Sequence, residues 1–342
     1  MTDTDRSAEG FALEPFPSGW FVVGYSDEVG EGDVRPLDYF GTSMICYRGE
    51  SGAVYVREAF CPHLGAHIGY GGRVDGDNVV CPFHGWTYGV DGCNVTIPYA
   101  DRPNRQARLR CWPVRESGGL ILAWHHPAGA EPTWEVGAIE ELSDPDFVSV
   151  TRTDFEINVH PQEVLENSVD LAHFLPVHGA ARMPDVNVRI DGPRLTATTT
   201  NQLLRSTKGY FEGGVSSDLW GLGIDVARIT GVVDTVAVLA LTPIDGRRVH
   251  ARFAVTARSG GPGEKRDPAA ALALAQKAKD RVIAEFETDL VIWEHKRYEP
   301  RPRLTKGERL ITRFRRWAQQ FYDEAGAQET PADHSGGGAS IP

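Results

Sequence analysis

The chain has 342 residues, of which 47 are acidic and 35 basic, and its formal net charge is −12. This length suggests two domains that each bury a core, and the negative charge argues against a nucleic acid or an anionic membrane surface as the main partner. The five cysteines are an odd number, which argues against a secreted disulfide scaffold and favours a reducing, cytoplasmic location.

The sequence gives no sign of a membrane anchor. No stretch approaches the roughly 20 apolar residues of a membrane span, and the N-terminus lacks a basic region followed by an apolar run. We therefore expect a soluble protein. Residues 1–15 are expected to be flexible, and residues 326–342, which cannot bury apolar surface, are expected to form a disordered tail.

Residues 16–134 are predicted to form a small antiparallel β domain. Short runs rich in strand-forming residues, such as WFVVGY and SMICYR, are bounded by Gly, Asp, Glu or Ser turn signals. The stretch AGAEPTWEV is rich in Pro, Gly and Ala and marks a domain boundary near residue 134.

Residues 135–325 are predicted to form a second domain of strands and helices. Several runs between residues 147 and 258 favour strands, and an apolar, β-branched run over residues 232–244 is assigned to the core of a sheet. Helical spacing covers residues 161–175 and ends near Phe174, ahead of Pro176. Further helices are predicted over residues 268–297 and 306–322.

Two short loops in the first domain each carry one cysteine and one histidine. CPHLG supplies Cys61 and His63, and CPFHG begins seventeen residues after His63 and supplies Cys81 and His84. A [2Fe–2S] cluster held between two loops could take one thiolate from each loop on one iron and one imidazole from each on the other. The two loops therefore predict such a cluster.

Zinc is the alternative metal for these loops, but it usually takes C-x₂₋₄-C pairs in a closed set of four ligands. Four unconnected core residues would not recur in register. Gly65 and Gly85 fall where tight turns would let backbone amides approach the cluster sulfides. His67 exceeds the four ligands needed, so we expect it beside the ligands or at the surface. The other cysteines are expected to be small core residues: Cys46, Cys93 and Cys111.

A second group of possible metal ligands lies in ENSVDLAHFLPVHG. Asp170 and His173 are three residues apart and would share a helix face, whereas His173 and His178 are five apart, which a straight helix would separate by roughly 140°. Pro176 would bend the chain so that His178 can turn back towards His173. Two imidazoles and one carboxylate would leave open positions on Fe(II) for oxygen.

The two groups together resemble a known family. C-x-H, seventeen residues and C-x-x-H followed by Gly-Trp is the Rieske [2Fe–2S] signature, and D-x-x-H-x₄-H resembles the motif in the catalytic domain of Rieske non-haem iron oxygenases. The resemblance implies an α+β fold, with an antiparallel β Rieske domain followed by a helix-grip catalytic domain, an antiparallel sheet plus a long helix. It also implies a mononuclear Fe(II) held by His173 and His178, with O₂ as co-substrate.

The third ligand of the mononuclear iron must be a distant carboxylate. In the long predicted helix, Asp289 lies in line with the apolar stripe of Val282, Phe286 and Trp293, where an unpaired carboxylate would be costly unless a metal offset the cost. Spacing alone leaves Glu294 open as a ligand, because it flanks the apolar face on the other side at a similar angle. DLVIWEHK resembles a D-x-x-I-W segment of the 3-ketosteroid 9α-hydroxylase and cholesterol 7-desaturase branch, which implies that Asp289 is the ligand and Glu294 the alternative.

The resemblance gives Asp170 a separate role. It implies that this carboxylate bridges His173 to His84 or His63 of another chain in a head-to-tail ring, which we expect to be a homotrimer. The alternative is a solvated carboxylate on a helix surface. Asn167 matches the E-N-x-x-D pattern of the family, which implies that it supports the site by hydrogen bonding.

The function implied is that of the terminal oxygenase component of a Rieske monooxygenase, which hydroxylates a steroid or a similar bulky, hydrophobic polycyclic molecule. No nicotinamide or flavin motif is evident, so electrons are expected from a separate ferredoxin and/or an NAD(P)H-dependent flavin reductase. Alternatives are a sterol desaturase or O-demethylase using the same iron, or a non-catalytic Rieske electron-transfer protein. Candidate pocket residues are apolar: Phe174, Leu175, Trp220, Leu222 and Trp293.

Overall fold

The computed structural model describes residues 12–150, 152–200, 202–206, 209–230, 233–258 and 267–322. Most of the N-terminal segment expected to be flexible (residues 1–11) and the whole expected tail (residues 326–342) lie outside these ranges. Within them, no helix combines the length and the apolar character needed to cross a membrane.

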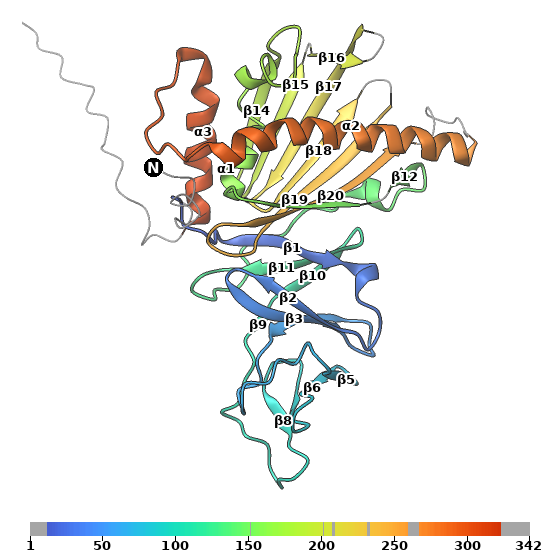
Figure 1. Cartoon of the computed structure of the whole chain (residues 1–342), viewed down its shortest axis with the longest axis vertical. Helices are drawn as coiled ribbons and strands as arrows, with labels where there is room; N and C mark the ends of the chain where they lie inside the picture. Colours follow the sequence, from blue (N-terminus) through green and yellow to red (C-terminus); the bar gives the residue numbers. More distant parts are fainter. Residues whose placement is uncertain are drawn as a thin grey trace, which may run out of the picture.

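The N-terminal part consists of short antiparallel strands in three small sheets (Figure 1). The sheets have the orders β1-β11-β10, β2-β3-β4-β9 and β5-β6-β7-β8. The strands are β1 Gly19–Tyr25, β2 Val34–Tyr39, β3 Thr42–Arg48, β4 Val54–Glu58, β5 Arg73–Asp75, β6 Asn78–Val80, β7 Thr87–Tyr88, β8 Asn94–Thr96, β9 Cys111–Trp112, β10 Val114–Ser117 and β11 Leu120–His125. The tight β2–β3 hairpin has positive φ at both loop residues, Phe40 and Gly41, which is typical of a type I′ turn.

The C-terminal part is built on a nine-stranded antiparallel sheet whose main path is β12-β20-β19-β18-β17-β15-β14. Strand β13 also pairs with β20, and β16 pairs with β17. The strands are β12 Phe147–Ser149, β13 Thr153–Ile157, β14 Asp185–Asp191, β15 Arg194–Thr200, β16 Gln202–Ser206, β17 Gly209–Trp220, β18 Ile224–Thr230, β19 Thr235–Pro243 and β20 Val249–Arg258.

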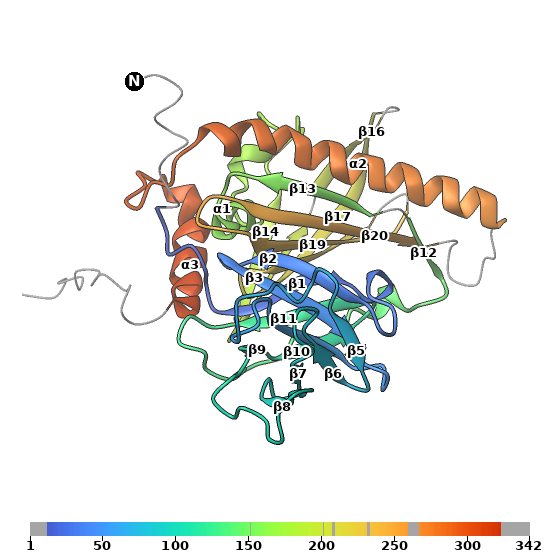
Figure 2. The same cartoon turned by 60° about the horizontal axis from the view of Figure 1, so that its bottom comes forward.

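This large sheet is covered on both faces. The long helix α2 (Pro268–His295) crosses one face, and the β1-β11-β10 sheet packs against the other (Figures 1 and 2). Strand β19 is therefore buried along almost its whole length, as expected for a strand with no solvent face. The prediction that the apolar run reaching residue 244 forms sheet core is confirmed, and so is the α+β fold class.

The two C-terminal helices begin with well-formed caps. The Asp267 side chain accepts a hydrogen bond from the Ala270 amide at 3.1 Å, and Pro268 occupies the first turn of α2. Helix α2 begins where it was predicted, at residue 268, and ends at His295, two residues before the predicted end. The helix predicted over residues 306–322 is α3 (Arg309–Ala318), flanked by the 3₁₀ turns η5 (Lys306–Glu308) and η6 (Gln319–Phe321).

The helix predicted over residues 161–175 is wrong beyond its first part. Helix α1 spans only Pro161–Glu166, and the 3₁₀ turn η4 (Ala172–Phe174) follows after an irregular stretch. Beyond the end of α1, polar side chains make hydrogen bonds that do not belong to a helix. The Ser168 hydroxyl donates to Asp225 at 3.5 Å, and the Asp170 carboxylate accepts from the Ala172 amide at 3.2 Å, so both compete with helical hydrogen bonding.

The prediction that three further cysteines lie in the core holds in part. Cys46 is buried and Cys93 is half-buried, but Cys111 is exposed. Successive residues of a strand point to opposite faces, and β9 turns Trp112 inward, so its neighbour Cys111 points outward.

Candidate metal centres

The two Cys/His loops, residues 61–66 and 81–86, have the same hydrogen-bonding pattern. In each, the cysteine carbonyl accepts from the glycine amide four residues on, Gly65 or Gly85, at 2.9 and 3.1 Å. Each cysteine amide also donates to the carbonyl five residues on, at 2.9 Å in both loops. The glycines have φ values of +74° and +69°, a region in which a side chain would be strained. The two loops, which are similar in sequence, therefore also have similar backbone conformations.

The loops bring the four predicted cluster ligands together, and the cysteines and histidines differ in burial. Cys61 and Cys81 are buried, whereas the rings of His63 and His84 are half-buried, with their centroids 4.7 Å apart. Burial raises the pKa of the Cys81 thiol, and hydrogen bonds from the amides of Phe83 and His84 oppose that shift. Inner thiolates and outer imidazoles suit the two irons of a Rieske-type cluster, so the donor set fits the group that the sequence predicts.

Aromatic side chains surround these ligands. The Tyr88 hydroxyl lies 3.0 Å from the Cys61 sulfur, and burial raises the pKa of Tyr88, so the phenol stays protonated and can donate to a thiolate. Trp86 stacks on His63 with centroids 4.3 Å apart, and its indole N–H donates to the Tyr99 hydroxyl at 2.7 Å. The sequence reasoning did not include Tyr88, although it follows His84 by only four residues.

His67 contacts its own loop. Its Nδ1 accepts a hydrogen bond from the Gly69 amide at 3.1 Å, and its ring packs edge-on against Phe60 with centroids 5.0 Å apart. These contacts fix the ring without involving either cysteine. The expectation that His67 is not a cluster ligand stays a prediction.

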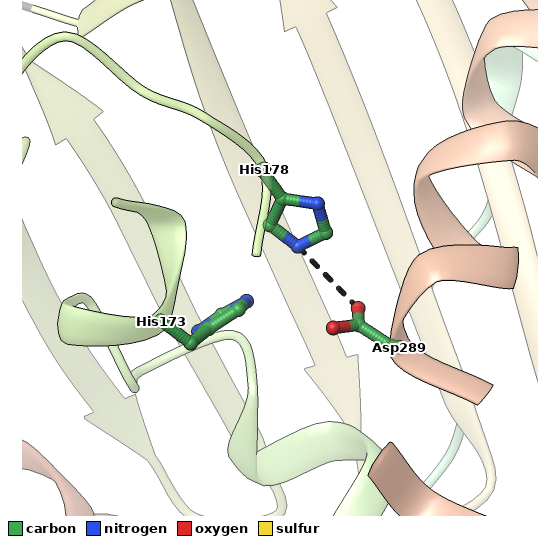
Figure 3. A group of neighbouring side chains, drawn as sticks. All are labelled: His173, His178 and Asp289. Carbon is green, nitrogen blue, oxygen red and sulfur yellow. Dashed lines mark ion pairs between the residues drawn. The ribbon is translucent and has the colours of Figure 1, made fainter. Parts of the chain in front are cut away.

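A second group of ligand atoms comes together from distant parts of the chain (Figure 3). His173 in η4, His178 in the following turn and Asp289 in α2 each offer one atom, and these atoms lie within 4.8 Å of one another. The Nε2 atom of His178 is 3.4 Å from the Asp289 carboxylate. Asp289 is buried, with only 8% of its surface exposed. The turn predicted at Pro176 is present, and it returns His178 to His173.

The remaining ring nitrogens of the two histidines are engaged elsewhere. The Nδ1 of His173 donates to the backbone carbonyl of Asp170 at 2.5 Å. The Nδ1 of His178 lies 2.9 Å from the Glu285 carboxylate and 3.3 Å from the Thr288 hydroxyl. Both Nε2 atoms are thereby left to face Asp289, and two imidazoles with one carboxylate fit the oxygenase type of Fe(II) site.

The protonation of the two rings differs. Burial lowers the pKa of His173, so this imidazole is neutral. Burial also lowers the pKa of His178, but hydrogen bonds to Asp289 and Glu285 outweigh that effect and raise it to about 9. A metal that binds here must therefore displace a proton from His178. The sequence reasoning missed Glu285; its position one helical turn before Asp289 was the available signal.

The other predicted residues fall around this centre. Asp170 lines a hollow of about 230 Å³ together with Met183, Glu308 and Ile311. Asn167 is the C-cap residue of α1, and the support that its side chain would give stays a prediction. Glu294, the alternative carboxylate, is exposed and is not part of the group of ligand atoms.

The candidate pocket residues divide between two faces of the large sheet. Phe174 packs against both histidines, with centroids 4.6 Å from His173 and 5.5 Å from His178. Trp293 is buried on the α2 side. Trp220 instead packs in the core shared with the N-terminal sheet, so its assignment to the pocket is wrong. Its side chain alternates with that of Leu219, which points to the α2 side.

Helix α1 holds the segment that carries Asp170 and the two histidines. The Glu166 carboxylate receives two hydrogen bonds from the Arg315 guanidinium, at 2.6 and 2.9 Å. Glu163 lies 3.3 Å from the Lys296 ammonium, and Gln162 accepts from the Tyr322 hydroxyl at 2.8 Å. These buried polar contacts fix α1 against the C-terminal segments and so position the metal-binding turn.

Asp225 is a buried carboxyl beneath the same segment. Its Oδ2 accepts from Ser168, while its Oδ1 has no hydrogen-bond partner among the described residues. Burial raises the pKa of Asp225 from 3.8 to about 7. The folded chain therefore holds this proton to a higher pH than the unfolded chain does, and folding loses stability as the pH rises from about 4 to about 7.

Replacing Asp225 by asparagine is expected to make the free energy of unfolding less dependent on pH. Between pH 6 and pH 8.5 the wild-type free energy of unfolding should fall by about 1 kcal/mol more than that of Asp225→Asn, because only the wild type loses the proton. Urea unfolding followed by tryptophan fluorescence at both pH values measures the difference. Parallel pH dependence in the two proteins would contradict the raised pKa.

Comparison with known proteins gives two matching family descriptions. Residues 19–113 match the Rieske [2Fe-2S] domain, and residues 123–322 match the 3-ketosteroid 9alpha-hydroxylase C-terminal domain. The cholesterol 7-desaturase of Bombyx mori is 32% identical over 91% of this chain and 70% of its own length. The oxygenase component of 3-ketosteroid-9-alpha-monooxygenase from Rhodococcus rhodochrous is 29% identical over 90% of this chain and 84% of its own length.

Solved structures show the same fold at lower sequence identity. Dicamba monooxygenase bound to dicamba has a TM-score of 0.66 at 18% identity and covers 88% of this chain and 96% of its own. The NdmB protein of Pseudomonas putida has a TM-score of 0.68 at 17% identity and covers 88% of this chain and 89% of its own.

Proposed function

Because the chain belongs to the Rieske non-haem iron oxygenases, in the group of the 3-ketosteroid 9α-hydroxylases and cholesterol 7-desaturases, we propose that it hydroxylates a steroid or a similar bulky polycyclic molecule. When bound, the [2Fe–2S] cluster supplies single electrons and the mononuclear Fe(II) activates O₂ for attack on a C–H bond. The observation that carries the proposal is the convergence of His173, His178 and Asp289, which a simple electron carrier would not need.

Each Cys/His loop contributes two residues to the proposed electron inlet. Cys61 and Cys81 would hold one iron of the cluster, and the imidazoles of His63 and His84 would hold the other. Two observations support this division: the thiols are buried, and the histidine rings are closer to solvent. Tyr88 and the loop amides can donate hydrogen bonds towards the cysteine sulfur atoms, which would stabilise the negative charge of the thiolates.

At the second centre, the protein orients the ligands and places apolar side chains beside them. His173 and His178 present their Nε2 atoms, and Asp289 supplies the carboxylate from the buried face of α2. Phe174 packs on both rings, and Phe286 lies one helical turn before Asp289 in the apolar core. These apolar side chains suit a hydrophobic substrate.

We further propose that Asp170 links the two centres of neighbouring chains in a homotrimer. Strands β5 to β8, which flank the Cys/His loops, lie far from α1 in both views of the molecule (Figures 1 and 2), so a histidine meeting Asp170 would come from another chain. Two groups of exposed apolar residues support such packing. Those beside the loops are Phe60, Leu64, Tyr70 and Phe83, and those beside the second centre are Leu175, Met183, Val291 and Ile292.

Electrons come from a separate reductase or ferredoxin, as for the oxygenase components among the relatives. We propose an NAD(P)H-dependent flavin reductase, acting directly or through a ferredoxin. A cytoplasmic location suits these partners. All five cysteines are free, which agrees with a reducing compartment.

Product analysis tests the proposed function. The protein would be incubated with a flavin reductase and ferredoxin system, O₂ and a panel of 3-ketosteroids, with His173→Ala as the inactive control. We expect a hydroxylated product that requires O₂ and is absent with the control. A new double bond or a lost O-methyl group would instead identify a desaturase or a demethylase, and no O₂-dependent product from any steroid would contradict the proposed substrate class.

A further inference from the structure

Helix α2 contacts both nitrogens of a single imidazole. Glu285, Thr288 and Asp289 lie three and four residues apart and so share one face of the helix. Asp289 lies 3.4 Å from Nε2 of His178, while Glu285 lies 2.9 Å from Nδ1 of the same ring. The ring is therefore held edge-on between two carboxylates that come from successive turns of one rigid element.

The contacts at Nδ1 select one tautomer of the ring. The Thr288 hydroxyl donates its own proton to the backbone carbonyl of Glu285 at 2.6 Å, so it can only accept from His178. The Glu285 carboxylate is also an acceptor. With two acceptors around it, Nδ1 must carry the hydrogen, and the lone pair of the neutral ring then lies on Nε2, which faces Asp289.

The two proposed iron histidines differ in how they are held. The Nδ1 of His173 bonds to a backbone carbonyl, that of Asp170, which no side-chain substitution removes. The Nδ1 of His178 depends on side chains, and Glu285 is the closer of the two. Arg281, one turn earlier on α2, lies 3.9 Å from the other Glu285 oxygen and helps to hold the carboxylate.

We propose that Glu285 is a positioning residue of the mononuclear centre, which orients His178 through Nδ1 so that Nε2 points to the metal. The inference rests on the proposed function, because it takes His178 to be a metal ligand. Outer hydrogen-bond partners of metal-binding histidines typically contribute 10- to 100-fold to metal affinity. Glu285 is expected to contribute within this range.

Anaerobic Fe(II) titration of protein that retains its cluster tests the proposal without substrate or turnover. In Glu285→Ala, Fe(II) affinity at the mononuclear centre should fall about 10- to 100-fold. Glu287→Ala, which removes the same charge from an exposed position on the same helix, should bind as the wild type does. Cluster absorption should match in all three proteins, and equal affinity in Glu285→Ala and Glu287→Ala would overturn the proposal.

Glu285→Gln separates orientation from charge. It removes the charge but keeps an oxygen that accepts from Nδ1, so its affinity should lie between those of the wild type and Glu285→Ala. A loss as large as that in Glu285→Ala would mean that charge alone matters, and would overturn the positioning role. If neither the wild type nor the Glu285 variants bound Fe(II) beyond the cluster iron, the proposed function itself would fail.

Discussion

His84→Ala is expected to abolish the visible absorption of the Rieske cluster. The two imidazoles of the Cys/His loops lie 4.7 Å apart, and each loop can supply only one of them. Removing His84 would leave the outer iron with a single imidazole and open it to solvent, because these rings are only half-buried. Absorption between 400 and 600 nm, together with the sulfide content, measures the loss.

His67→Ala is the matched control for this change. His67 directly follows the first Cys/His loop, and its Nδ1 accepts from the Gly69 amide, so its loss should leave the cluster absorption intact. Normal absorption in His84→Ala, or equal losses in the two variants, would contradict the assignment of the ligands.

Asp170→Asn is expected to lower turnover by at least about 100-fold while both metal centres remain loaded. The contact that orients His173 is made by the backbone carbonyl of Asp170, at 2.5 Å, and is kept in the variant. The side-chain oxygen that accepts from the Ala172 amide is also kept, because asparagine retains a carbonyl oxygen. The variant removes the charge of this carboxylate, which lies 3.9 Å from Nδ1 of His173 and which would pair with a histidine of a neighbouring chain.

Turnover, iron content and cluster absorption together measure the effect of Asp170→Asn. Asp191→Asn, an equivalent change at a highly exposed carboxylate, should leave all three unchanged. Loss of iron from Asp170→Asn would assign the residue to the metal site, and normal turnover would exclude the bridge between chains.

The sequence predicted best those features that depend on short spacing. The hydrogen-bonding pattern of the two Cys/His loops repeats because Gly65 and Gly85 occupy the same position after each cysteine. The turn between His173 and His178 follows in the same way from Pro176. Each of these features lies within a few residues of the chain, so local chemistry is enough to define it.

Features that depend on packing could not be predicted in this way. The helical periodicity of residues 161–175 gave no hint that Ser168 would bond to Asp225, on a distant strand, where the helix has already ended. Asp289 and Glu294 flank the apolar face of the helix on opposite sides, at similar angles to it. Only the packing of α2 on the sheet makes Asp289 buried and Glu294 exposed.

Glu285 illustrates the same limit. Its partner His178 lies 107 residues earlier in the chain, and the spacing of α2 alone shows only that Glu285 and Asp289 share a face. Trp220 is the opposite case, because its apolar character suggested the pocket, whereas strand alternation turns it to the other side of the sheet.

The iron content per chain tests the central claim most directly, namely that His173, His178 and Asp289 hold a mononuclear iron beside the cluster. After anaerobic loading with Fe(II), the wild type should contain one iron more than the two of its [2Fe–2S] cluster. Asp289→Ala should lose that iron and Glu294→Ala should keep it. A wild type with only the cluster iron, or loss of the extra iron from Glu294→Ala but not from Asp289→Ala, would contradict the claim.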